Sequence, residues 1–147
     1  MRPLLTAPFV NTAIRVVIGG IFIYAGLMKM MDPWAFARAV DSFHLLPTAL
    51  ISPVALVLPA LEVLAGALWV LNRAAVSAAV TIFGLCLLFA AVLGTALLRG
   101  LPVNCGCFGA ALGGSTPTVA LLRDGFFLVA TTYWLAAVRP RTSARRA

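Results

Sequence analysis

The chain has 147 residues, of which 63% are hydrophobic and only 10% are charged, whereas soluble domains carry about 25% charged residues. The interior of so small a domain cannot enclose this much apolar surface, which excludes an ordinary water-soluble fold and indicates an integral membrane protein. The net charge of +7 would also suit a nucleic-acid-binding protein, but four arginines cluster in the last nine residues, directly after an apolar segment. This placement is typical of a membrane topology signal, and we expect no nucleic-acid partner.

Four apolar segments have nearly the length of about 20 residues with which a helix crosses a bilayer. Their ranges are 11–31, 52–71, 74–98 and 118–138. None of them alternates polar and apolar residues as the strands of a membrane barrel do, so each must satisfy its backbone as a helix. The sequence therefore predicts an all-α membrane protein, with a single four-helix transmembrane bundle over residues 1–147 and a basic cytoplasmic tail at 139–147.

The connections between these segments differ in character. Residues 32–47 alternate polar side chains with aromatic and aliphatic ones, which predicts a short amphipathic helix on the membrane surface, with Asp32 as its N-cap and Pro33 in its first turn. A tight turn is expected at residues 72–73. Residues 99–117 are too rich in Gly and Pro for a regular helix and are expected to form a loop that carries two cysteines.

The basic residues predict the orientation of the bundle in the membrane. Arg2, Arg73 and the C-terminal arginines fall on one side of the predicted bundle, against Arg38 and Arg99 on the other. By the positive-inside rule, both termini are cytoplasmic. We therefore expect a multi-pass protein of the bacterial inner membrane, in contact with the lipid bilayer, with the amphipathic helix and the cysteine loop extracytoplasmic, where thiols meet oxidising chemistry.

The sharpest local signal is the pair Cys105 and Cys107, separated only by Gly106. Such a pair can close a small strained disulfide that exchanges readily, and it could alternatively bind a soft metal ion such as Cu(I) or have no role. We favour redox exchange, since paired thiols on the outer face rarely lack a chemical role. Cys86 lies within an apolar segment, where a thiol usually packs as a small apolar group.

Charged residues inside the apolar segments are a second candidate site. Glu62 lies in the middle of the second segment, where a carboxylate is costly unless it is paired or protonated. Lys29 lies near the outer end of the first segment, and Arg123 with Asp124 lies in the outer turns of the fourth. Two pairings of Glu62 are compatible with the spacing, with Arg123 or with Lys29, and Lys29 could instead pair with Asp124. A positive cluster below the cysteine loop would lower the pKa of a thiol there.

Short runs distributed over most of the chain carry a family resemblance. They are YAGLMK and DP around the end of the first segment, LP at 46–47, LPALE at 58–62, NCGCFG at 104–109 and LRD at 122–124. Together they resemble the MauE/DoxX group of small membrane proteins, and within it the methylamine utilisation branch. The CxCFG element is the most specific part of the match.

This resemblance implies a four-helix membrane protein of redox maturation, which works with a thioredoxin-like partner to form disulfides in the small subunit of methylamine dehydrogenase. The interpretation is a possible thiol-disulfide oxidoreductase whose catalytic Cys105 and Cys107 exchange disulfides with an extracytoplasmic thioredoxin-fold protein. The cysteine pair is supported by four charged residues within the membrane segments, Lys29, Glu62, Arg123 and Asp124. By analogy with other four-helix membrane thiol oxidases, a quinone would accept the electrons, although the opposite direction of electron flow is equally open.

Two other readings stay open at this point. The chain could be a non-enzymatic scaffold that holds a thioredoxin-like protein and its client at the membrane. It could also carry a soft metal ion such as copper, because Met28, Met30 and Met31 gather near the outer end of the first segment, although no metal site is assigned. The client, the terminal acceptor and the oligomeric state do not follow from the sequence.

Overall fold

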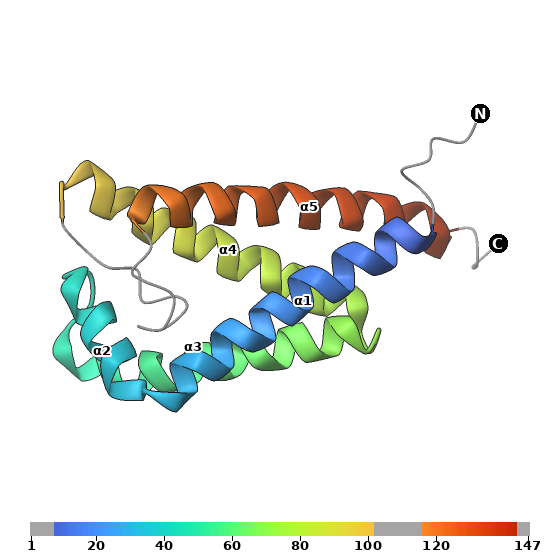
Figure 1. Cartoon of the computed structure of the whole chain (residues 1–147). Coiled ribbons are helices and arrows are strands. Elements are labelled where there is room, and N and C mark those ends of the chain that lie inside the picture. The colour runs from blue at the N-terminus through green and yellow to red at the C-terminus, as the bar shows by residue number, and fades with distance from the viewer. Residues whose placement is uncertain (1–7, 102–115, 144–147) are drawn as a thin grey trace.

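The computed structural model describes residues 8–101 and 116–143, and within these ranges all regular structure is helical (Figure 1). The helices are α1 (Pro8–Met31), α2 (Pro33–Ser42), α3 (Thr48–Val70), α4 (Ala75–Leu98) and α5 (Pro117–Ser143). Helices α1, α3 and α4 and the part of α5 up to Val138 are each long and apolar enough to cross a membrane. The predicted all-helical multi-pass membrane protein is confirmed, while the predicted cysteine loop lies largely outside the described residues.

The helices extend beyond the apolar segments from which they were predicted. Helix α1 begins at Pro8 rather than at residue 11, α3 begins at Thr48 rather than at residue 52, and α5 continues to Ser143. The physical reason is that backbone hydrogen bonding ends where a turn or a proline interrupts it, whereas hydropathy marks only the part that suits hydrocarbon. The residues predicted as the start of a basic tail are therefore still helical.

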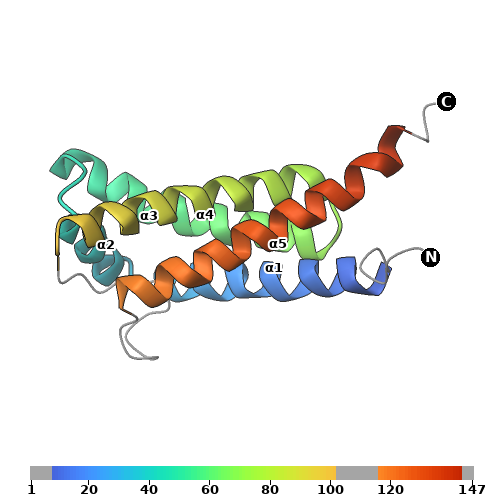
Figure 2. The same cartoon turned by 90° about the horizontal axis from the view of Figure 1, so that it is seen from above.

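The four long helices form two crossed pairs that pack together into one bundle. Helix α1 packs on α3 and α4 packs on α5, and contacts between α3 and α4 join the two pairs. Figures 1 and 2 show α2 at one end of this bundle, whereas α1 begins and α5 ends at the other. We refer to these as the α2 end and the opposite end. Which end faces the cytoplasm stays a prediction.

Helix α2 forms for the local reasons that the sequence indicated. The side chain of Asp32 caps it by accepting a hydrogen bond of 2.9 Å from the backbone N–H of Ala35, and Pro33 occupies the first turn. Phe36 is buried against the bundle, whereas Trp34 is 76% exposed. The predicted short amphipathic helix is confirmed, with its end at Ser42 rather than near residue 47.

Helices α1 and α3 approach each other closely because glycines lie on both sides of their contact. A Cβ atom on Gly66 would lie 2.6 Å from the carbonyl oxygen of Gly19, and one on Gly26 would lie 2.8 Å from the carbonyl oxygen of Pro59. Such distances are incompatible with any residue larger than glycine unless the helices move apart. We call this contact, with Gly19 and Gly26 on α1 and Gly66 on α3, the glycine seam. Its glycines set the separation of α1 and α3, as small residues do in membrane helix pairs.

We expect Gly66→Ala to destabilise the bundle, because its Cβ atom would meet backbone rather than a flexible side chain. Overpacking of this kind costs about 1–3 kcal/mol. The measurement is thermal unfolding of the purified protein in detergent. Gly84→Ala on α4 is the matched control, since nothing lies within 4 Å of a Cβ there and the gain in helix propensity is the same. Equal unfolding temperatures for the two variants would contradict the close-packed seam.

Candidate functional site

A buried ion pair joins α1 to α3 below the α2 end of the bundle. The Lys29 Nζ atom donates to both carboxylate oxygens of Glu62, at 2.6 Å to Oε1 and 2.8 Å to Oε2. The two residues are 4% and 1% exposed. Their helices are held close together by the glycine seam, and Lys29 lies one turn beyond Gly26. The pair therefore follows from backbone packing, which brings an amine near the end of α1 to a carboxylate in the middle of α3.

A second ion pair lies on α5. The Arg123 guanidinium donates from Nε at 3.2 Å and from Nη2 at 3.0 Å to the same oxygen of Asp124, Oδ1. Of the alternatives that the sequence left open for Glu62, the structure has the pair with Lys29, and Asp124 pairs with Arg123 rather than with Lys29. The physical reason is that α1 packs mainly on α3, so Lys29 reaches Glu62 first, while the long Arg123 side chain folds back to its neighbour in sequence.

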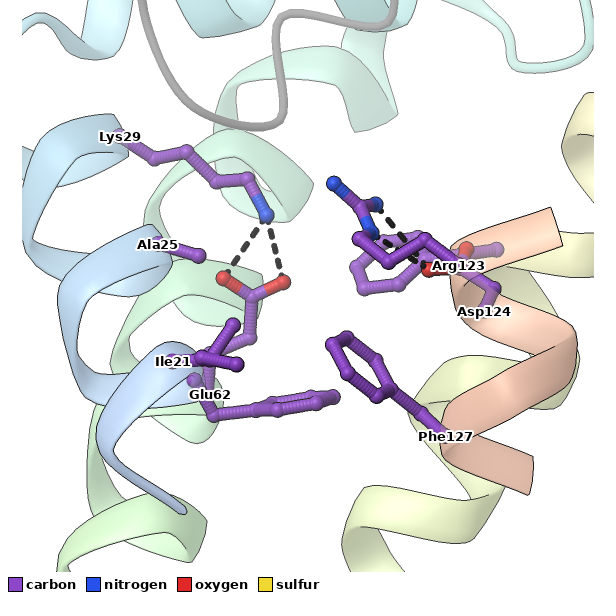
Figure 3. Close-up of a pocket in the computed structure, with 9 residues that line it drawn as sticks. Ile21, Ala25, Lys29, Glu62, Arg123, Asp124 and Phe127 are labelled. Atoms are coloured by element: carbon purple, nitrogen blue, oxygen red, sulfur yellow. Dashed lines mark hydrogen bonds and ion pairs between the residues drawn. The ribbon is translucent and has the colours of Figure 1, made fainter. Parts of the chain in front are cut away.

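The two ion pairs face each other across a small cavity (Figure 3). All four charged residues line it, together with the aromatic side chains of Phe22, Phe89 and Phe127, and its volume is about 30 Å³. This is enough for a water molecule, which needs roughly 10–15 Å³ by the same measure. The predicted convergence of Lys29, Glu62, Arg123 and Asp124 is present in the structure, with two positive and two negative groups side by side.

One oxygen at this cavity has no hydrogen-bond partner within the described part of the chain. Asp124 Oδ2 is buried and accepts nothing, although Oδ1 of the same carboxylate accepts two bonds. A buried acceptor without a partner is costly and is usually served by water. The cavity therefore has the polarity and the size for a water that bridges Asp124 to the Lys29–Glu62 pair.

The Lys29 ammonium also lies against two aromatic rings. Its Nζ atom is 4.9 Å from the centroid of the Phe89 ring and 5.2 Å from that of the Phe36 ring, distances at which a cation is attracted to the ring face. Only two of the three N–H groups of the ammonium are used by Glu62. Within the described part of the chain, the third donor of Lys29 therefore has no hydrogen-bond acceptor.

A larger apolar cavity opens on the other side of Lys29. It has a volume of about 250 Å³ and lies between α2, α3 and α4, and among the described residues that line it Lys29 alone carries a charge. Leu58, Val92 and Leu93 form part of its apolar wall, and Phe36 and Phe89 also contribute. A lipid-soluble molecule in this cavity would lie beside the ammonium of Lys29.

Cys105 and Cys107 lie outside the described residues, so their place as the catalytic pair stays a prediction. The residues that flank their segment are described. Leu101 packs against a cluster that includes Phe43 of the α2 end and Ala120 of α5, and Arg99 Nη1 donates to the carbonyl of Phe43 at 2.9 Å. The segment that contains the cysteines therefore starts and ends at the α2 end, the end toward which the charged cluster lies.

The aromatic partners of Lys29 were not recognised as site residues from the sequence. In the sequence, Phe36 is one of several apolar residues in the segment 32–47, and Phe89 stands in an apolar run where nothing distinguishes it from its neighbours. Only the packing of α4 against the end of α1 reveals its position. Cys86 is buried as predicted, and the described residues hold no cluster of three or more His, Cys, Asp or Glu that could bind a metal ion.

We expect Glu62→Gln and Lys29→Met each to destabilise the protein, because each leaves the other charge buried without its partner. Breaking a buried pair in this way costs about 3–5 kcal/mol, whereas replacing both partners by apolar residues of similar size is often neutral. The measurements are yield and thermal unfolding in detergent.

The double variant Lys29→Met with Glu62→Leu is the control for this experiment. It should regain most of the lost stability, because no unpaired charge remains. A double variant as unstable as the sum of the two single variants would show that the pair is not a coupled unit. Normal stability of Glu62→Gln together with lost activity would indicate proton handling or ligand binding by the carboxylate, whereas wild-type behaviour in both respects would remove Glu62 from the candidate site.

The family profile described as "Methylamine utilisation protein MauE" matches residues 7–137. The methylamine utilization protein MauE of Paracoccus denitrificans is 36% identical over 137 residues, which cover 92% of this chain and 72% of the relative. No solved structure is significantly similar to the chain. Because the profile spans nearly all of the chain, including all four predicted membrane helices, this membrane protein belongs to the MauE family of methylamine utilisation proteins.

Proposed function

We propose that this protein exchanges disulfides with a thioredoxin-fold partner outside the cytoplasm, through Cys105 and Cys107. The observation that carries the proposal is the buried, charge-balanced cluster of Lys29, Glu62, Arg123 and Asp124. Buried ionisable groups inside membrane helices are costly, and they usually mark a functional site. This cluster lies toward the end of the bundle from which the cysteine segment extends, so groups able to hold or move protons accompany the thiols.

The proposed disulfide exchange conserves electrons and protons. The Cys105–Cys107 disulfide takes two electrons and two protons from two thiols of the partner, which leaves the partner with a disulfide and the pair as two thiols. The partner then passes its disulfide to the client, for which the family relationship favours the small subunit of methylamine dehydrogenase. The reduced pair would return to the Cys105–Cys107 disulfide by passing two electrons and two protons to an oxidant, and a lipid-soluble quinone would supply that chemistry.

The apolar cavity beside Lys29 is our proposed position for the quinone. It offers about 250 Å³ among aliphatic and aromatic side chains, which suits a ring with an isoprenoid tail. Two of the three Lys29 N–H groups are committed to Glu62, so the third can donate to a quinone carbonyl. Lys29 lines both this cavity and the small polar cavity, which supports a route for protons from the charged cluster to the reduced oxygen.

The surface of the α2 end favours a second candidate function, that of a scaffold that holds the partner without exchanging electrons. Trp34 and Met31 are 76% and 79% exposed there. Large apolar side chains at such an end can contact a partner protein or the membrane interface. A scaffold would keep its function when both cysteines are replaced by serine, which separates the two candidates.

We expect Cys107→Ser to accumulate a mixed disulfide between Cys105 and the thioredoxin-fold partner, or Cys105→Ser to accumulate one through Cys107. The resolving thiol is then missing, so the intermediate of the exchange is not released. The measurement is a non-reducing gel of membranes from each variant, with the shifted band identified by mass spectrometry.

Cys86→Ser is the matched control for trapping, because Cys86 is buried between helices and should neither form an adduct nor change one. A membrane-impermeant thiol reagent, added to intact cells after mild reduction, tests the orientation in the same strains. No adduct in either variant, together with a wild-type pair that stays as two free thiols in oxidising buffer, would refute the exchange reaction.

We expect Val92→Trp to slow reoxidation of the cysteine pair by a short-chain quinone, because the larger side chain would fill the apolar cavity. Overpacking costs about 1–3 kcal/mol, so binding should weaken on the order of tenfold. The measurement is quinol formation by purified protein with a reduced dithiol as the donor. Val80→Trp is the control, because Val80 lies on the same helix and is exposed to lipid. If Val92→Trp forms quinol at the wild-type rate, the quinone does not bind in this cavity. The disulfide exchange would still be supported if the cysteine variants form the mixed disulfide.

A further inference from the structure

The opposite end of the bundle contains a cavity that the proposed function does not use. It has a volume of about 300 Å³ and lies between the start of α1, the turn from α3 to α4, the start of α4 and the later part of α5. Asn11, Thr12 and Arg15 form its polar side, and Val76, Trp134 and Val138 are among its apolar residues. This volume is near the lower limit for ligand sites, about 300–1,000 Å³.

Two polar groups that line this cavity have no hydrogen-bond partner among residues 8–101 and 116–143. The Nε atom of Arg15 and the Oδ1 atom of Asn11 are both buried, and neither makes a hydrogen bond. The described residues also provide no ion pair to Arg15. An arginine within a membrane-spanning helix is costly without an anion, and each buried polar group without a hydrogen-bond partner adds to that cost. These two atoms are therefore available to a ligand that carries both an acceptor and a donor.

The chain has no acidic side chain that could neutralise Arg15. It contains only four acidic residues. Glu62 and Asp124 are paired in the charged cluster, while Asp32 and Asp41 belong to α2 and its cap. Figure 1 shows α2 at the other end of the bundle.

With these four residues placed, no acidic side chain of the sequence is left to serve as the counter-anion of Arg15.

We propose that this cavity binds the headgroup of an anionic glycerophospholipid, with the phosphate on the guanidinium of Arg15. Arg15 lies seven residues after the start of α1 at Pro8, which is about 10 Å along the helix axis and suits the boundary between headgroups and hydrocarbon. The planar guanidinium matches phosphate oxygens in pairs. Basic pockets between membrane helices are known to bind lipid headgroups. The apolar side of the cavity, which includes Val76 and Val138, accommodates the start of an acyl chain.

The unpaired oxygen of Asn11 narrows the choice of headgroup. Oδ1 accepts hydrogen bonds, so the occupant needs a donor in addition to its phosphate. The hydroxyl groups of phosphatidylglycerol supply that donor and leave the phosphate charge uncompensated for Arg15. A choline headgroup has the same phosphate but no donor, and its ammonium offsets the charge. The site therefore prefers phosphatidylglycerol to phosphatidylcholine.

The test is native mass spectrometry of the full chain in detergent with phosphatidylglycerol or phosphatidylcholine of identical acyl chains. The wild type should retain phosphatidylglycerol on the order of tenfold better, and Arg15→Gln should lose this preference, because hydrogen bonds to charged groups contribute about 1.5–3 kcal/mol. Arg38→Gln is the matched control, since Arg38 is an exposed arginine on α2. Asn11→Leu should keep the affinity for phosphate but lower the preference for the glycerol headgroup.

Thermal unfolding distinguishes a variant that has lost the lipid site from one that does not fold. Arg15→Gln removes an unpaired cation and should unfold at or above the wild-type temperature in lipid-free detergent, while phosphatidylglycerol should raise that temperature only for the wild type and Arg38→Gln. Equal binding of the two lipids, or unchanged binding in Arg15→Gln, would overturn the proposal. Stabilisation by inorganic phosphate as strong as that by phosphatidylglycerol would identify a site for a free anion instead. The outcome is independent of the disulfide exchange proposed above.

Discussion

The buried pair of Lys29 and Glu62 is the constraint on which the rest of the structure depends. Neither charge could stay in hydrocarbon alone at an acceptable cost, so α1 and α3 must remain in the register that keeps Nζ within 2.8 Å of both carboxylate oxygens. That register is possible because glycines bring the two backbones into contact. Packing and electrostatics thus constrain each other, and a change in either one affects both.

A second ion pair lies beside this one, so the cluster contains equal numbers of basic and acidic side chains. The Arg123–Asp124 pair faces Lys29 and Glu62 across a cavity large enough for water, and two aromatic rings lie against the Lys29 ammonium. A cluster that served only to hold helices together would have little need of a free acceptor on Asp124 or of an apolar cavity beside the lysine. These features are those expected of a membrane site that binds a ligand or moves protons.

The two ends of the bundle satisfy their charges by different means. Near the α2 end, each buried charge has a partner of opposite sign from the chain itself. At the opposite end, no ion pair to Arg15 is present within the described ranges, and the four acidic side chains of the sequence all lie elsewhere. A protein so poor in acidic side chains relies on its surroundings for the missing counter-charge, and in a membrane the surroundings are phospholipid. The bilayer then takes part in the structure as a specific ligand as well as a solvent.

The sequence by itself determined the membrane class, the four spanning helices and the cap of α2, because hydropathy and capping depend on residues near one another in the chain. It also singled out Lys29, Glu62, Arg123 and Asp124, since a charge within an apolar segment is conspicuous in any arrangement. Only the tertiary structure decided that Lys29 pairs with Glu62 rather than with Asp124. That choice depends on which helices pack closest, which involves glycines far apart in the sequence. The role of Phe89 and the unpaired state of Arg15 were decided there too, because an ordinary phenylalanine or arginine acquires a function only from the neighbours that folding brings to it.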